Sequence, residues 1–199
     1  LIWGATFTFT DWGLEYCSPL LYLILRFSIA VVLCVVFFNT KLFSMSKNMV
    51  KNGALLGFLF GGGFVFQTMG INETTVSNSA FITGLTVTIV PFMFWIFTKK
   101  KVLLFSKIGV IIASCGLYVF TDPSTNNFNN GDLFTLISIF FWATYITLLD
   151  KYTKEHNEIK STMQMAFMQM ISALALFIIV FFLYELPSYK IEFNSQLLS

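Results

Sequence analysis

Long apolar segments alternate with short polar links along the chain. A helix needs about 20 mainly apolar residues to cross a bilayer, and the lipid core does not tolerate exposed strand edges or loops. The pattern therefore predicts an all-α, polytopic membrane helix bundle, with about seven helices in this sequence. The predicted helices cover residues 1–13, 19–38, 53–71, 76–97, 108–120, 133–149 and 163–184.

The fourth segment is apolar enough to span a membrane, yet it carries many hydroxyl side chains. Four of them recur at intervals of 4, 4 and 3 residues, which places them on one helical face. They are Thr75, Ser79, Thr83 and Thr86, and Asn78 lies beside that face. One interpretation is a helix that lines a polar cavity. The alternative is that small hydroxyls allow close helix packing and bond their own backbone. Pro91 predicts a static kink in this helix, and the alternative is a flexible point.

The composition is that of a membrane protein. Only 11% of the residues are charged and 56% are hydrophobic, whereas soluble domains carry roughly 25% charged residues. Three cysteines, scattered along the chain, are too few for a disulfide or zinc framework. We therefore expect neither a metal nor a cofactor.

The basic residues fall on alternate links between the predicted helices. Ten of the twelve are Lys41, Lys47, Lys51, Lys99, Lys100, Lys101, Lys107, Lys151, Lys154 and Lys160. Most acidic residues lie on the other links. Because cytoplasmic links carry an excess of Lys and Arg, these lysine-rich links are expected to be cytoplasmic. The predicted location is a multi-pass position in a bacterial plasma membrane.

A short internal repeat relates the first and sixth predicted helices. The first contains IWGATFTF and the sixth contains FWATYITL. The link pattern gives these two helices opposite directions across the membrane. Inverted repeats with a site between them at mid-membrane are typical of many secondary transporters.

Four motifs in consistent order carry a family resemblance. They are LIWGATF, SPLLYLILRF, TTVSNSAFITGL followed by Pro91, and GDLFTLISIFFWATY. With these motifs the chain resembles the EamA-like family of the drug/metabolite transporter superfamily. The resemblance implies ten helices in two inverted five-helix halves, and a small metabolite as cargo. It implies that residues 1–121 form the first half and residues 122–199 the start of the second. We expect this sequence to be a fragment that lacks the helices from about the eighth onwards.

Several polar and aromatic side chains at membrane depth are candidates for substrate binding. Aromatic rings with a polar tip suit a cavity for an organic solute, although such residues also form the interfacial belt. An amide inside a span usually faces protein or water. The candidates are Trp3, Thr6, Gln67, Asn78, Ser79, Thr83, Thr86, Trp142 and Tyr145.

Arg26 is the only charge well inside a full predicted span. A charge at this depth indicates function and is expected to have a partner. Asp11 and Glu15 are the candidates, and the expected pair is Arg26 with Asp11. The alternatives for Arg26 are contact with a substrate, or a snorkelling side chain that fixes the first helix against the second.

These features predict a secondary transporter, without enzymatic activity, that moves a small metabolite by alternating access. No P-loop motif for ATP is present, and no acidic residue lies in the middle of a span, which favours export or exchange over proton coupling. The expected partners are the lipid bilayer and a small molecule, with no nucleic acid, and a homodimer remains open. The alternative is a structural or assembly protein of the membrane that transports nothing.

Overall fold

The structure, a computed structural model, describes residues 2–38, 45–99, 104–121, 128–153 and 159–185. All regular elements in these ranges are helical, which confirms the predicted all-α bundle. The helices are α1 (Ile2–Leu14), α2 (Pro19–Phe38), α3 (Lys47–Glu73), α4 (Val76–Gly84), α5 (Thr86–Thr98), α6 (Leu104–Thr121), α7 (Asn130–Thr153) and α8 (Ile159–Val180), which the π-helical turn η3 (Phe181–Glu185) continues.

Within these ranges, five helical stretches are long and apolar enough to cross a membrane. They are Pro19–Phe38, Lys47–Glu73, Val76–Thr98, Asn130–Thr153 and Ser161–Glu185. A shorter apolar helix at Lys107–Gly116 matches the short fifth segment of the sequence. The chain is a multi-pass integral membrane protein.

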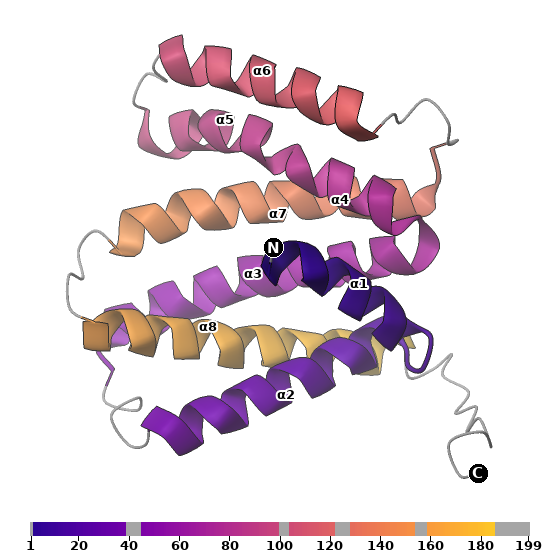
Figure 1. The fold of residues 1–199 in the computed structure, drawn as a ribbon. Helices are drawn as coiled ribbons and strands as arrows, with labels where there is room; N and C mark the ends of the chain where they lie inside the picture. The colour runs from indigo at the N-terminus through magenta and orange to yellow at the C-terminus, as the bar shows by residue number, and fades with distance from the viewer. Residues whose placement is uncertain (1, 39–44, 100–103, 122–127, 154–158, 186–199) are drawn as a thin grey trace.

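Helix α3 lies between α7 and α8 near the middle of the bundle (Figure 1). On the side of α8, three glycines spaced by four residues face their neighbour: Gly53, Gly57 and Gly61. A Cβ atom at Gly57 would lie 2.5 Å from the carbonyl oxygen of Gln169, and one at Gly61 would lie 3.1 Å from the Cα of Ala173. The close approach confirms that this glycine repeat serves packing. Residue numbers rise together along the contact, so α3 and α8 run parallel.

Helix α7 packs antiparallel against another face of α3. A Cβ atom at Gly63 would lie 3.0 Å from the indole ring of Trp142, and one at Gly70 would lie 2.9 Å from the carbonyl oxygen of Gly131. Residue numbers therefore rise along one helix as they fall along the other. Because Gly63 leaves room, α7 brings the Trp142 ring close to the backbone of α3, and Gly70 allows a similar approach of the α7 backbone.

Two apolar clusters hold the bundle together. The larger joins α2, α3 and α8, and its buried members are Leu20, Leu23, Phe27, Val65, Ala173 and Phe177. The smaller joins α3, α7 and α8 through Leu56, Leu148 and Met165. Many other large apolar side chains of α2, α5 and α6 are exposed, as expected for surfaces that face lipid.

The fourth predicted helix, expected over residues 76–97, is found as the helical stretch Val76–Thr98, with one irregular turn residue, Leu85, between α4 and α5. Helix α4 ends at Gly84 and α5 begins at Thr86, so the irregular residue Leu85 lies six residues before Pro91, where the kink was expected. The amide of Leu85 bonds back to Phe81 and Ile82, and the Thr86 hydroxyl donates to the carbonyl of Thr83 over 2.6 Å. Glycine weakens a helix, and a hydroxyl that bonds the preceding turn competes with it. These local effects explain the break.

The two ends of the bundle differ in charge, as the links predict. At one end, Thr74 at the α3–α4 junction donates to Asp132 over 2.6 Å, and Ser18 before α2 donates to Glu185 over 2.7 Å. At the opposite end, α3 and α6 begin and α5 and α7 end (Figure 1). These helix ends carry Lys47, Lys51, Lys99, Lys107 and Lys151. Lys41, Lys100, Lys101 and Lys154 lie outside the described residues. The assignment of the lysine-rich end to the cytoplasm stays a prediction.

Candidate functional site

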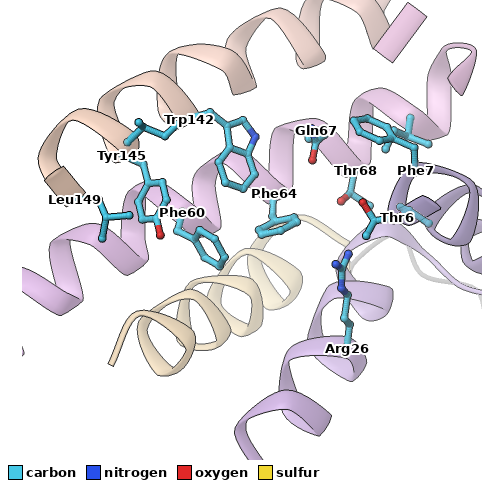
Figure 2. A pocket seen from close by; sticks show the side chains of 13 residues that line it. Thr6, Phe7, Arg26, Phe60, Phe64, Gln67, Thr68, Trp142, Tyr145 and Leu149 are labelled. Atoms are coloured by element: carbon cyan, nitrogen blue, oxygen red, sulfur yellow. The ribbon is translucent and has the colours of Figure 1, made fainter. Parts of the chain in front are cut away.

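A cavity of about 660 Å³ lies between α1, α2, α3 and α7. Figure 2 shows the side chains that converge on it from these helices. Its polar lining consists of Thr6, Thr10, Arg26, Gln67, Thr68 and Tyr145. The volume is within the usual range of about 300–1,000 Å³ for small-molecule sites. We call this space the central cavity.

Aromatic rings from α3 and α7 form one wall of the central cavity. The ring centroids of Phe64 and Trp142 are 4.9 Å apart, and those of Phe60 and Tyr145 are 5.2 Å apart. The Phe64 and Trp142 rings meet edge to face, the arrangement that aromatic quadrupoles prefer. Trp142 is only 4% exposed and lines the central cavity. Its role in substrate binding stays a prediction.

Tyr145 and Gln67 are held in place by side chains of neighbouring helices. The Tyr145 hydroxyl donates to Oε1 of Gln169 in α8 over 2.9 Å. Nε2 of Gln67 donates to the Thr83 hydroxyl in α4 over 3.0 Å. These bonds satisfy polar groups that would otherwise be costly away from water. They also fix the orientation of two polar groups at the central cavity.

A second cavity of about 350 Å³ lies where α4 and α5 meet, beside α1 and α7. Thr83 and Thr86 line it, together with Gly84 at the helix break. Phe7, Trp142 and Ile146 line both cavities. The second cavity and the central one are therefore neighbours.

The hydroxyl face predicted on the fourth segment divides between two environments. Ser79 is fully buried, and its hydroxyl lies 3.3 Å from that of Thr135 in α7. Asn78 donates its amide to Asp132 over 3.4 Å. Neither side chain lines either cavity. In the structure, therefore, Ser79 contributes to helix packing, whereas Thr83 and Thr86 line the second cavity.

Arg26 reaches the central cavity from α2 (Figure 2). Its guanidinium carbon lies 5.3 Å from the centroid of the Phe64 ring, within the range of a cation–π contact. The expected pair with Asp11 of α1 stays a prediction. The other candidate residue of the first helix, Trp3, belongs to α1, but its side chain lies outside the described part of the structure.

Asp132 is a residue that the sequence analysis did not single out. It is only 2% exposed, although it lies in the first turn of α7. Its carboxylate accepts bonds from the Thr74 hydroxyl and from the backbone amide of Asn129 over 3.0 Å, while Asn129 Oδ1 accepts from the amide of Asp132 over 2.9 Å. This reciprocal pattern is a capping box. Its sequence signal is an Asn followed three residues later by an Asp, just before an apolar run.

The described residues hold no cluster of three or more His, Cys, Asp or Glu side chains that could bind a metal ion. The arrangement offers instead hydroxyls, amides, one guanidinium and aromatic faces. Such groups bind an organic solute by hydrogen bonds and apolar contact. They offer no nucleophile paired with a base.

The fold and the cavities define a class of protein, a polytopic membrane bundle with a solute-sized space between its helices. Residues 1–121 match the model of the EamA-like transporter family. The chain belongs to the EamA-like transporter family, within the superfamily that its motifs resemble.

Two relatives come from Archaeoglobus fulgidus, and each is named an uncharacterized transporter. One is 31% identical over 162 residues, which cover 79% of this chain and 48% of the relative. The other is 26% identical over 162 residues, which cover 80% of this chain and 58% of the relative. The chain thus spans about half the length of the relatives it matches. No solved structure matches it.

Proposed function

We propose that the protein is a secondary transporter that moves a small polar or amphipathic metabolite, such as an amino acid or a nucleotide-related solute. The observation that carries the proposal is the central cavity. It is large enough for such a solute and combines an aromatic wall with hydroxyl, amide and guanidinium groups. The family and the names of the relatives point to the same activity.

The binding residues that we propose are those that line the two cavities. Thr6, Gln67, Trp142 and Tyr145 line the central cavity, and Thr83 and Thr86 line the second. Asn78 and Ser79 act in this proposal by holding α4 against α7, on the strength of their contacts with Asp132 and Thr135.

The break at Leu85 supports movement by alternating access. Many secondary transporters place discontinuous helices beside the substrate site, and Gly84 and Thr86 line the second cavity. The irregular turn at Leu85, whose amide is shared between the carbonyls of Phe81 and Ile82, is a suitable hinge for α4 against α5. Rocking about this hinge would open the cavities to one face of the membrane at a time.

Export or exchange fits the described cavities better than proton coupling. Proton-coupled carriers generally use an acidic group inside the membrane. Among the described residues that line the two cavities, none is an Asp or a Glu. The buried Asp132 lies at the end of α7, where its oxygens accept bonds from neighbouring groups.

The proposed organisation is that of two inverted five-helix halves, with residues 1–121 in the first and residues 122–199 at the start of the second. The opposite directions of α1 and α7 in Figure 1 agree with this division. We place the protein in the plasma membrane with the lysine-rich end in the cytoplasm. A bacterial membrane and a homodimer remain predictions, and the two relatives come from an archaeon.

A counterflow assay tests this function. Purified protein would first be screened with amino acids, nucleosides and organic acids for thermal stabilisation. Solutes that stabilise it would then be tested for exchange across proteoliposomes. Trp142→Ala is expected to abolish exchange. Trp95→Ala is the matched control, because Trp95 is 51% exposed on α5 and lines neither cavity. Equal exchange by both variants would contradict the proposed site.

A further inference from the structure

The charge of the central cavity narrows the class of solute. Among the described residues that line it, Arg26 is the one with a formal charge. Asp11 and Glu15, the acids first considered as partners of Arg26, are not among them. A guanidinium remains protonated at any physiological pH. The cavity is therefore cationic and attracts an anion over a cation.

The position of Arg26 leaves its donors directed at the cavity. The guanidinium carbon lies 5.3 Å from the centre of the Phe64 ring, and Figure 2 shows the group between Phe64 and Thr6. An aromatic face attracts the cation, but this contact does not use the planar fork of N–H donors. That fork matches the two oxygens of a carboxylate. Thr6 and Thr68 lie close by, and each adds a hydroxyl to the same region of the cavity.

The wall beyond Arg26 suits an apolar body. Phe64 contacts both Arg26 and Trp142, so a guanidinium and an aromatic surface meet at one side chain. The rings of Phe60 and Trp142, 5.5 Å apart, extend this surface towards α7. A solute that spans the cavity thus meets a cation at one end and flat apolar area at the other.

We propose that the substrate is an organic anion with an aromatic or other apolar body. Its carboxylate, or another anionic group, binds Arg26, and its body lies against Phe60, Phe64 and Trp142. This inference rests on the proposed function, because it names the solute class for the same central cavity.

Three probes with a common indole ring test the charge preference. Indole-3-propionate is an anion, tryptamine is a cation and tryptophol is neutral. Binding would be measured by calorimetry with the purified protein in lipid nanodiscs. We expect indole-3-propionate to bind at least about tenfold more tightly than either of the others, a difference of about 1.4 kcal/mol.

Substitutions then assign the preference to Arg26. Arg26→Gln is expected to reduce the affinity for indole-3-propionate to that for tryptophol and to leave the latter unchanged. Arg26→Lys keeps the charge and retains part of the preference. Lys151→Gln is the matched control, because Lys151 also lies over an aromatic ring, that of Tyr152 at 5.9 Å, but lines neither cavity. It is expected to leave all three affinities unchanged.

The outcomes separate this inference from the function on which it rests. If tryptamine binds as tightly as the anion, and Trp142→Ala abolishes that binding, the cavity is a solute site but the anion proposal is wrong. An anion preference that survives Arg26→Gln also overturns it. If none of the three probes binds, both the anion proposal and the assignment of this cavity as a site for aromatic solutes fall.

Discussion

The side-chain amide of Gln67 donates a hydrogen bond to the hydroxyl of Thr83 over 3.0 Å. Gln67 lines the central cavity and Thr83 lines the second cavity. The bond therefore joins α3 to α4 between the two spaces, just before the helix break. Gln67 of the central cavity and Thr83 of the second cavity thus hold each other in position.

A double-mutant cycle on Gln67 and Thr83 measures this bond. Interhelical hydrogen bonds in membranes contribute about 0.6 kcal/mol on average and up to about 1.7 kcal/mol. We expect Gln67→Ala and Thr83→Ala to destabilise the bundle, and the double variant to cost less than their sum by an amount in that range. Unfolding in detergent measures the coupling.

Thr144→Ala is the control, since its hydroxyl donates to the carbonyl of Phe140 in its own helix. Gln67→Ala with Thr144→Ala should be additive, and coupling of that size in the control pair would argue against a specific bond.

The glycine repeat on α3 predicts where a single methyl group is not tolerated. A Cβ atom at Gly57 would lie 2.5 Å from the carbonyl oxygen of Gln169. Gly57→Ala therefore forces α3 and α8 apart, at a cost of about 1–3 kcal/mol by the usual penalty of overpacking. At Gly109 in α6, a Cβ atom would meet nothing within 4 Å. Gly109→Ala is expected to leave stability unchanged or to raise it, because alanine favours a helix. Thermal unfolding compares the two, and equal stability would show that the α3–α8 contact is looser than the structure has it.

The helices and their packing faces could be predicted because they depend on local pattern. An apolar run of the right length has few alternatives in lipid, and glycines every fourth residue mark a close contact wherever the partner lies. The depth of Trp142 follows from the rise of a helix. Thr6, Gln67 and Tyr145, three candidates from different helices, line one cavity in the structure, and their roles in binding stay predictions.

The partners of the polar side chains could not be predicted in this way. The spacing places Ser79 and Thr83 on one face of a helix, but only the neighbouring helices decide that Ser79 meets Thr135 while Thr83 meets Gln67. The break at Leu85 divides that face further, because α5 need not continue the helical phase of α4. The burial of Asp132 likewise depends on the end of α3, which is distant in sequence.

Asp132 is expected to stabilise the junction of α3, α4 and α7. It accepts a bond of 2.6 Å from Thr74, and Asn78 lies within 3.4 Å. Hydrogen bonds to a charged group contribute about 1.5–3 kcal/mol each. Asp132→Ala removes the acceptors and should lower the free energy of unfolding by about 2 kcal/mol or more, whereas Asp132→Asn, which keeps one oxygen, should cost less.

The control for Asp132 is Glu73→Gln at the end of α3. Glu73 is exposed, and surface substitutions usually change stability by less than about 0.5 kcal/mol. Chemical denaturation of the three variants in the same lipid nanodiscs provides the comparison. If Asp132→Ala is as mild as Glu73→Gln, the buried carboxylate does not hold the junction together.

Cys17 in the α1–α2 link is expected to react slowly with alkylating agents. Burial raises the pKa of its thiol above the ordinary value, and the nearby Glu185 carboxylate raises it further. Since the thiolate is the reactive form, alkylation should accelerate at a higher pH in the folded protein than in the denatured chain. Iodoacetamide labelling, followed by mass spectrometry in a variant with Cys34→Ala and Cys115→Ala, measures both profiles. Glu185→Gln should lower the pH at which alkylation of the folded protein accelerates. This shift should be smaller than the one caused by denaturation, because burial contributes more than Glu185 to the raised pKa of Cys17. Identical profiles for the folded and denatured protein would contradict a raised pKa of this half-buried thiol.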